Sequence, residues 1–238
     1  MARTGPEMMA DDHRVATGNC LPLEGRLPDL RDFSVEELAA FLAALGEKPF
    51  RVRQIVKWLY RTGSNRSEDM TDLSRNLRER LNNVARISAA TCLRTDQAAD
   101  GTVKFLWSLD DGARIESVLI PEREHYTLCL SSQVGCAMGC RFCRTAGLGW
   151  RRHLTQAEII NQFLGAKASL PQGSQLTNLV FMGMGEPLAN LDHVLRALRI
   201  LTDPGLIGLS RRHLSVSTVG LVNELTRLAE AVTIGLTV

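Results

Sequence analysis

The sequence predicts an α/β fold in which a small helical region and a β-hairpin precede about four strand–helix units. Two observations predict this fold. From Tyr126 onward, short apolar segments alternate with amphipathic helical segments, and "DDG" separates two β-rich segments just before them. Repeated βα units give parallel strands with right-handed crossovers, so the sheet is either doubly wound or part of a barrel. In both cases a functional site is expected at the carboxyl ends of the strands.

Residues 1–26 show no hydrophobic period and are predicted to be a disordered tail, and residues 27–98 are predicted to form a helical accessory domain. "SVEE" at Ser34 is a capping box, and the helix that it starts is expected to stop at Gly46. A second helix opens after Pro49. A third helix is predicted from its apolar positions Leu73, Leu77 and Leu81.

The helical region is more basic than the chain as a whole, whose formal net charge is only +2. Between Lys48 and Arg86 there are ten basic and four acidic residues, an excess of six positive charges. Three basic residues recur every fourth position on one helix face: Arg53, Lys57 and Arg61. This pattern is typical of an RNA-binding surface and equally of a solvated charged surface, and charge alone does not separate the two.

The second half of the chain is predicted as a hairpin linker at residues 99–125 and a parallel domain at residues 126–238. The hairpin strands are Thr102–Leu109 and Ala113–Ile120. The parallel strands are Tyr126–Ser131, Asn178–Met182, His213–Ser217 and Val232–Val238. The helices between them are Thr155–Ala168, Leu191–Leu201 and Leu221–Ala231. The most informative motifs follow the first three parallel strands, where the site is expected.

No apolar segment approaches the length of a membrane span, and Met1 to Cys20 contains no apolar core typical of a signal peptide. We therefore expect a cytoplasmic protein with reduced thiols and no membrane partner. Clustered cysteines in such a protein are more often metal ligands or redox groups than a disulfide framework.

Three of the six cysteines lie within eight residues of each other: Cys136, Cys140 and Cys143. A structural zinc site uses four ligands, and only His153 is near enough in sequence to suggest a fourth. Three thiolates would leave one iron of a 4Fe–4S cluster open to a ligand, as reductive cleavage of S-adenosylmethionine requires. From spacing alone, a zinc knuckle or incidental cysteines remain the alternative.

The remaining motifs make the pattern specific. The cysteine motif with Phe142 before its third cysteine resembles the radical S-adenosylmethionine signature, and "MGMGEP" resembles the glycine–glutamate motif of that superfamily. Seven segments occur in the order found in the RlmN/Cfr family of RNA methyltransferases: "KPFRVRQIVKWLY", "MTDLS", "DGTVKFLWSL", "IESVLIPE", "TLCLSSQVGCAMGCRFCRTA", "VFMGMGEPLAN" and "LSVSTVG". The resemblance extends from about Leu27 to Val238.

The resemblance implies a partial radical S-adenosylmethionine barrel and two cofactors, a 4Fe–4S cluster and S-adenosylmethionine. It assigns the cluster to Cys136, Cys140 and Cys143. It assigns S-adenosylmethionine contacts to Gly185, Glu186 and Ser217, where glycines would allow close approach and Glu186 could accept a hydrogen bond from the cofactor's amino group.

The resemblance also implies the reaction. An electron from a reductant such as flavodoxin would cleave one S-adenosylmethionine, and the radical formed would activate a methyl group carried on a cysteine for addition to an adenine carbon. Glu116 matches the family's proton acceptor. Cys129 matches the cysteine that resolves the RNA adduct by forming a disulfide with a cysteine near the C-terminus. From the sequence alone, Glu116 would be interpreted as an ordinary strand carboxylate and Cys129 as a buried strand thiol.

Three functions remain open at this level. The first is methylation of adenine C2 in 23S ribosomal RNA and transfer RNA, which the basic segment starting at Lys48 favours weakly. The second is C8 methylation of 23S ribosomal RNA by a Cfr-like enzyme. The third is a non-catalytic fragment that binds RNA and a structural metal.

The sequence ends at Val238, within the expected fourth parallel strand, and all its cysteines lie at or before Cys143. The family's methyl-carrying cysteine is therefore not part of this sequence. We expect a chain of these 238 residues to be inactive alone, and 2-methyladenosine formed by it in vitro would contradict that expectation.

Overall fold

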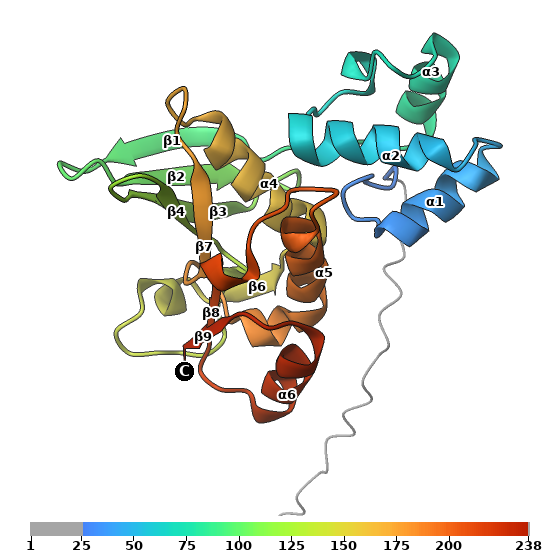
Figure 1. Cartoon of the computed structure of the whole chain (residues 1–238). Helices are drawn as coiled ribbons and strands as arrows, with labels where there is room; N and C mark the ends of the chain where they lie inside the picture. Colours follow the sequence, from blue (N-terminus) through green and yellow to red (C-terminus); the bar gives the residue numbers. More distant parts are fainter. Residues whose placement is uncertain (1–25, 238) are drawn as a thin grey trace, which may run out of the picture.

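The computed structural model describes residues 26–237; the predicted tail up to residue 25, with Cys20, and Val238 lie outside the described residues. A seven-stranded sheet carries helices α4, α5 and α6 on one face, and a unit of three shorter helices lies beside them (Figure 1). The loop that contains Cys136, Cys140 and Cys143 projects at the end of the molecule farthest from that unit, at the lower left of Figure 1.

The predicted N-terminal helices are present. They are α1 (Val35–Ala44), α2 (Phe50–Val56), which continues as η1 (Lys57–Thr62), and α3 (Arg75–Val84), with the short turn η2 (Ser67–Asp69) before α3. The Ser34 side chain accepts from the Glu37 amide and the Glu37 carboxylate accepts from the Ser34 amide, so the capping box is confirmed. Apolar side chains from all three helices are buried between them.

The sheet has the order β1-β2-β3-β4-β7-β8-β9. Its antiparallel part consists of β1 (Thr91–Gln97), β2 (Val103–Ser108), β3 (Arg114–Pro121) and β4 (Tyr126–Cys129). Its parallel part adds β7 (Leu176–Phe181), β8 (Leu214–Ser217) and β9 (Gly235–Thr237) to β4. The predicted α/β class and its parallel strands are therefore observed.

Two features of the sheet differ from the sequence-based prediction. The segment Thr91–Gln97, placed in the helical domain, is a strand; nearly every residue in it is exposed, so no apolar alternation signals it. The hairpin β2–β3, predicted as a linker at residues 99–125, is continuous with the sheet because β3 pairs with β4. The hairpin therefore contributes side chains to the same sheet faces as the parallel strands.

Burial alternates along the central strands and separates the sheet into two faces. Leu128, Leu179, Phe181, Leu214 and Val216 are buried on the face toward the helices. That face is covered by α4 (Gln156–Ala168), α5 (Leu191–Thr202) and α6 (Val222–Ala231). Their intervening residues point to the opposite face and are only partly buried, so that face is uncovered in the described residues.

The helical unit is fastened to the sheet domain through one buried arginine. The Arg31 guanidinium, only 1% exposed, donates to the carbonyl oxygens of Leu59 and Ser64 in the helical unit and to Asn161 Oδ1 on α4 at 2.9 Å. The Gln156 side chain on α4 donates to the Arg31 carbonyl oxygen. These bonds cross from the first helices to the sheet domain and fix the orientation of the two parts.

Among the described helices, none is long and apolar enough to cross a membrane.

Candidate active site

Three of the predicted site residues lie on the uncovered face of the sheet. Val118 pairs with Cys129 across β3 and β4, and Glu116 lies two residues before Val118, so both side chains point to the same side. Cys129 pairs in turn with Val180 on β7 and Val180 with Ser215 on β8, which places Ser217 on that side as well. Tertiary structure thus brings Glu116, Cys129 and Ser217, from three separate strands, to one surface.

The Glu116 carboxylate is held by a lysine that the sequence analysis did not single out. Lys104 Nζ on β2 lies 3.1 Å from Glu116 Oε1, and both side chains are slightly less than half exposed. The Glu116 carbonyl oxygen accepts from Ser131 Oγ at 2.5 Å, which fixes β3 against the end of β4. Glu116 is therefore positioned by its neighbours but still open to solvent.

Cys129, the last residue of β4, has a different environment. Burial raises the pKa of its thiol above the ordinary value, and the nearby backbone of Met182 offsets this in part. The thiol is therefore protonated at neutral pH. All five described cysteines are free, so the disulfide that the resemblance implied for Cys129 is not supported.

The cysteine loop is carried by a two-stranded ribbon, β5 (Gln133–Gly135) and β6 (Trp150–His153). Gly135 has a φ of 77°, and a Cβ there would overlap the backbone oxygen of Gly149. That oxygen accepts from the Cys136 amide at 3.1 Å. The ribbon thus closes the base of the loop, and the three cysteines follow at its tip together with the short helix η3 (Arg144–Leu148).

The chemistry of this donor set fits a 4Fe–4S cluster. Three soft thiol ligands lie on one loop, all partly exposed, and a hydrogen bond from the Ala146 backbone lowers the pKa of Cys143 and so favours its thiolate. Among the described residues, no three His, Cys, Asp or Glu side chains are already gathered as metal ligands. Nothing lies within 4 Å of the position a Cβ would take at Gly139, so the tip of the loop is loosely packed.

His153, considered as a fourth ligand, is engaged elsewhere. Its Nδ1 lies 3.0 Å from Gln133 Nε2, and its ring packs edge-on against Trp150. Because Gln133 Oε1 accepts from the Glu186 amide, Gln133 Nε2 is the donor and His153 Nδ1 the acceptor. Burial also lowers the pKa of His153, in keeping with a neutral ring.

Glu186 and Gly185 lie where β7 passes toward α5, and both are closely packed. Glu186 is 3% exposed, and its carboxylate accepts from the amides of Leu188 and Val219 and from Thr218 Oγ1. A carboxylate offers about four acceptor positions, so one remains for a further donor. Gly185 has a φ of 99°, and a Cβ there would lie 2.5 Å from Gln133 Cβ. The Cβ side of Gly185 is therefore filled by Gln133, and Glu186 ties the ends of β7 and β8 together.

Sequence reasoning missed Lys104, Gln133 and Thr218. The hairpin turn between β2 and β3 fixes a register that puts Lys104 diagonally opposite Glu116, so this pair could have been inferred from the "DDG" signal. Gln133 and Thr218 carry no signal of their own, because their contacts with the "GMGEP" segment join separate parts of the chain.

The loop at the end of the first parallel strand, and the glutamate at the end of the second, define the class of protein: a radical S-adenosylmethionine protein. Residues 130–238 match the family model of the radical SAM superfamily, and residues 28–87 match that of the ribosomal RNA large subunit methyltransferase N-terminal domain. Both matched parts of the chain are therefore similar to RlmN-type radical SAM methyltransferases.

Individual relatives agree with this assignment. The chain is 48% identical over 210 residues to the dual-specificity RNA methyltransferase RlmN of Geobacter sulfurreducens, and 48% identical over 210 residues to that of Geotalea uraniireducens. Each alignment covers 88% of this chain, and 57% and 60% of those relatives. The crystal structure of a radical SAM methyltransferase from Sphaerobacter thermophilus superposes with a TM-score of 0.82 at 39% identity, covering 88% of this chain and 62% of that one. The chain thus spans about 60% of the length of the relatives it matches.

The match of residues 130–238 to the radical SAM superfamily implies two cofactors, a 4Fe–4S cluster and S-adenosylmethionine.

Proposed function

We propose that the protein this chain belongs to methylates carbon C2 of an adenine in 23S ribosomal RNA and in transfer RNA, in the cytoplasm. Relatives that cover 88% of the chain carry the name dual-specificity RNA methyltransferase. An aromatic C2–H is not acidic and its carbon is not nucleophilic. Displacement of a methyl group from a sulfonium by an electron pair therefore has no route, and a one-electron reaction is required.

The observation that carries the proposal is the shared face of Glu116, Cys129 and Ser217. These side chains come from strands that are separated by up to about a hundred residues, yet they line the one face of the sheet that helices leave open. The cysteine loop leaves β4 only a few residues after Cys129. The proposed proton acceptor Glu116, the Cys129 thiol and the proposed cofactor-binding residue Ser217 would thus lie around one reaction site beside that loop.

Cys136, Cys140 and Cys143 would hold the cluster through their thiolates. When bound, the cluster supplies the single electron that cleaves S-adenosylmethionine. In this proposal, the remaining acceptor position of Glu186 receives an N–H of the cofactor's amino group, and Ser217 Oγ faces the same cofactor.

Glu116 is proposed to accept the proton that the adenine carbon loses. Lys104 holds the carboxylate from one side at 3.1 Å and leaves it open toward the uncovered face. Cys129 is a neutral thiol in the resting protein, since burial raises its pKa. It can act as a nucleophile in resolving the RNA adduct only after a base removes its proton.

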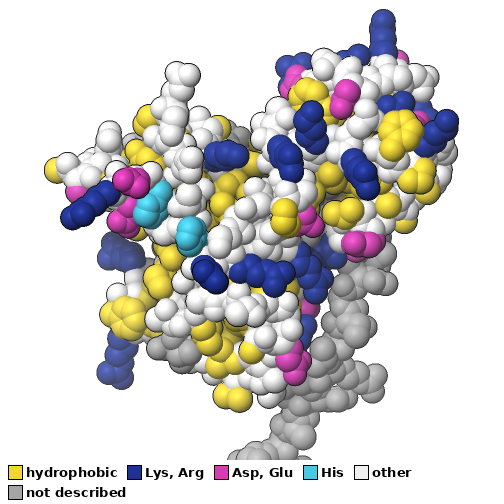
Figure 2. Space-filling view, viewed as in Figure 1, with side chains coloured by type: hydrophobic (Ala, Val, Ile, Leu, Met, Phe, Trp, Pro, Cys, Tyr) yellow, Lys and Arg dark blue, Asp and Glu magenta, His cyan; other side chains and the backbone are white. Residues whose placement is uncertain are grey.

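The RNA is proposed to bind the helical unit. Arg53, Lys57 and Arg61 are exposed on α2 and η1, and Figure 2 shows Lys and Arg side chains distributed over this part of the molecule. Phosphate contacts of this kind supply affinity that weakens as salt rises.

Anaerobic reconstitution with iron and sulfide, followed by electron paramagnetic resonance of the reduced protein, tests the cofactor assignment. A 4Fe–4S signal that shifts when S-adenosylmethionine is added supports an open iron on the three-cysteine loop, and Cys140→Ala should abolish it. Tightly held zinc, or a cluster signal indifferent to S-adenosylmethionine, would contradict the assignment.

Deletion of the gene that encodes this sequence tests the reaction itself. Mass spectrometry of nucleosides from the deletion strain should show loss of 2-methyladenosine from both 23S ribosomal RNA and transfer RNA. Loss of 8-methyladenosine instead would establish the C8 reaction, and unchanged nucleosides would refute an RNA methyltransferase.

A further inference from the structure

One buried amide side chain joins the two segments that the proposed function assigns to the cofactors. Gln133, the first residue of β5, is 2% exposed. Its Oε1 accepts from the Glu186 amide at 2.8 Å, and its Nε2 donates to His153 Nδ1 at 3.0 Å. The first bond reaches the segment of residues 182–187, and the second crosses the ribbon that carries the cysteine loop. Both polar atoms of this side chain are therefore used, one toward each segment.

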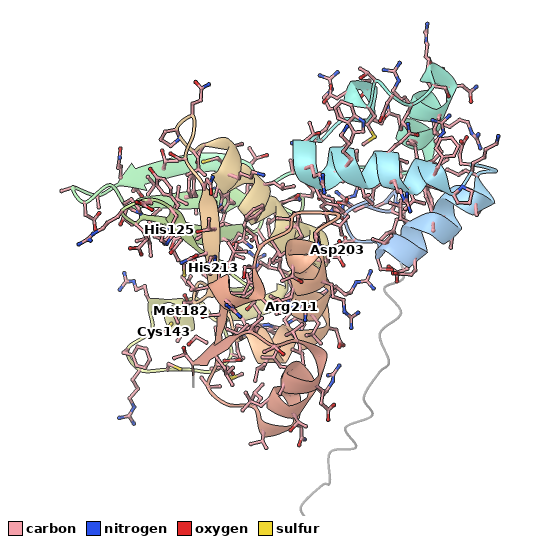
Figure 3. All side chains as sticks on the ribbon, viewed as in Figure 1. His125, Cys143, Met182, Asp203, Arg211 and His213 are labelled. Carbon is pink, nitrogen blue, oxygen red and sulfur yellow. The ribbon has the colours of Figure 1, made fainter. Side chains whose placement is uncertain are left out.

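The backbones of the two segments are also in direct contact. The Gln133 amide donates to the Met184 carbonyl oxygen at 3.1 Å. A Cβ at Gly185 would lie 2.5 Å from Gln133 Cβ, so no side chain fits between the two chains there. Figure 3 shows Met182 and Cys143 at the same end of the molecule. The segment of residues 182–187 and the cysteine loop are thus neighbours, and Gln133 lies at their junction.

The ribbon transmits the position of Gln133 to the cluster ligands. Cys136 follows Gln133 by three residues, and its amide donates to the Gly149 oxygen across the ribbon at 3.1 Å. Gln133 itself pairs with His153 on the partner strand. Because both strands are joined at these points, a shift of Gln133 relative to Glu186 moves the base of the cysteine loop as well.

The Glu186 carboxylate is fixed from another direction. It accepts from Thr218 Oγ1 at 2.5 Å and from the Val219 amide at 3.0 Å, both just beyond the end of β8. These bonds set the position of the carboxylate relative to β8, whereas Gln133 sets the main chain of the same residue relative to the ribbon. Loss of the Gln133 bond therefore leaves the carboxylate attached to β8 and frees its position relative to the cysteine loop.

We propose that Gln133 is a positioning residue for S-adenosylmethionine: it holds the cysteine loop where one cofactor molecule reaches both the loop and Glu186. The inference rests on the proposed function, in which Glu186 receives the cofactor's amino group and the loop carries the open iron. Hydrogen bonds behind the ligands of a metal site fix where those ligands stand, and their loss weakens the site although the ligands remain. The role requires no contact of Gln133 with the cofactor itself.

A role in packing alone predicts a different response to substitution. Burying an amide costs solvation free energy that its hydrogen bonds only offset, so an apolar side chain of similar volume would fill the space beside Gly185 as well. Methionine is then the better replacement. If Gln133 positions Glu186, the better replacement is glutamate. Glutamate keeps an acceptor for the Glu186 amide and places its second oxygen beside His153, whose ring can supply a proton from Nδ1.

The experiment compares Gln133→Met with Gln133→Glu and with a matched control, Gln156→Met. Gln156 on α4 is 1% exposed, and its side chain donates to the carbonyl oxygens of Arg31 and Phe33, outside the candidate active site. Each protein is reconstituted anaerobically and assayed for iron and sulfide. Equilibrium dialysis then measures the dissociation constant of S-adenosylmethionine, electron paramagnetic resonance measures the shift that it causes in the reduced cluster, and urea unfolding measures stability.

Gln133→Met should bind as much iron as the wild type, yet bind S-adenosylmethionine about tenfold more weakly or worse. Its cluster signal should shift less than that of the wild type at equal cofactor concentration. Gln133→Glu should recover most of the affinity. Gln156→Met should lose stability and keep the cofactor affinity of the wild type, which separates positioning from a general loss of stability.

Four results would overturn the inference. Gln133→Met builds no cluster, it keeps the cofactor affinity of the wild type, it binds the cofactor more tightly than Gln133→Glu does, or Gln156→Met loses as much affinity as Gln133→Met. Failure of the proposed function is recognised separately, in the wild type: a protein that builds no cluster, or whose cluster signal does not respond to S-adenosylmethionine, contradicts the proposed function and removes the basis of this inference.

Discussion

Glu116 and Cys129 illustrate how little of a site's chemistry is visible in single residues. Each occupies an ordinary strand position, and each acquires its character from a neighbour or from its depth in the fold. Glu116 is paired with Lys104, and burial raises the pKa of Cys129.

The environment of Cys129 predicts its reactivity. Only the thiolate is nucleophilic, so a raised pKa and partial burial should slow alkylation of Cys129 by iodoacetamide at pH 7.5, about tenfold relative to the exposed Cys92. Peptide mass spectrometry after timed quenching measures both rates in one sample. Equal rates would show that the end of β4 is open to solvent in solution.

The β5–β6 ribbon is the element that presents the cluster ligands, and its base tolerates no side chain. Gly135 and Gly139 both adopt positive φ, of 77° and 68°, but only at Gly135 would a Cβ overlap the backbone of Gly149. The two positions therefore separate backbone strain from steric exclusion.

Gly135→Ala should open the ribbon and reduce iron bound after reconstitution to well below half that of the wild type. Gly139→Ala carries the strain of positive φ alone, about 1 kcal/mol, and should retain most of its iron. Iron and sulfide assays on both variants make the comparison. A similar loss of iron in the two variants would mean that the backbone strain of a positive φ, and not the steric overlap at the base of the ribbon, limits cluster assembly.

Asp32, which precedes α1 and packs against the start of α4, has a partly buried carboxylate with pH-dependent effects on stability. Asp32 accepts from the Ala157 amide at 2.8 Å, yet burial raises its pKa to about 6. The folded state thus binds this proton more tightly than the unfolded state. The contribution of Asp32 to stability is therefore most favourable below pH 4 and is lost as the pH rises through 6.

Asp32→Asn removes this titration and keeps an oxygen that can accept from Ala157. At pH 7.5 the variant should be more stable than the wild type by about 1–3 kcal/mol, with a smaller difference at pH 4.5. Urea unfolding at the two pH values measures the change. If the wild type and the variant differ in free energy of unfolding by the same amount at both pH values, ionisation of Asp32 does not destabilise the folded state.

At the scale of the whole molecule, Arg31 joins the helical unit to the sheet domain. Its guanidinium donates to main-chain and side-chain oxygens of both parts, and burial lowers its pKa to about 10, still charged at neutral pH. No other side chain matches this planar set of donors, so lysine is not a conservative replacement.

Arg31→Lys should lower the free energy of unfolding by about 3 kcal/mol or more, because several buried carbonyl oxygens lose their donors. Arg75→Ala is the control: Arg75 is largely exposed, and loss of its pair with Glu79 should leave the free energy of unfolding nearly unchanged. Urea unfolding of the three proteins gives the values. If Arg31→Lys unfolds like the control, the two parts are held together by other contacts.

Much of the fold could be predicted because local signals and tertiary packing agree. The capping box at Ser34 starts its helix where expected, the helix predicted from Thr155 has Thr155 as its N-cap, and the "DDG" turn forms its hairpin. The strand Thr91–Gln97 could not be predicted, because its polar residues lack alternation and it forms only by pairing with β2. The roles of the predicted site residues stay predictions.

The sequence alone determined the family, the three thiols of the candidate cluster site and the order of the strand–helix units, because these depend on residue type and spacing along the chain. Only the tertiary structure decided which face each side chain reaches, that Lys104 holds Glu116, that Gln133 fills the space beside Gly185, and that Arg31 fixes the helical unit. The reason is physical: strand pairing and burial join residues that are distant in the chain, and local spacing carries no information about those contacts.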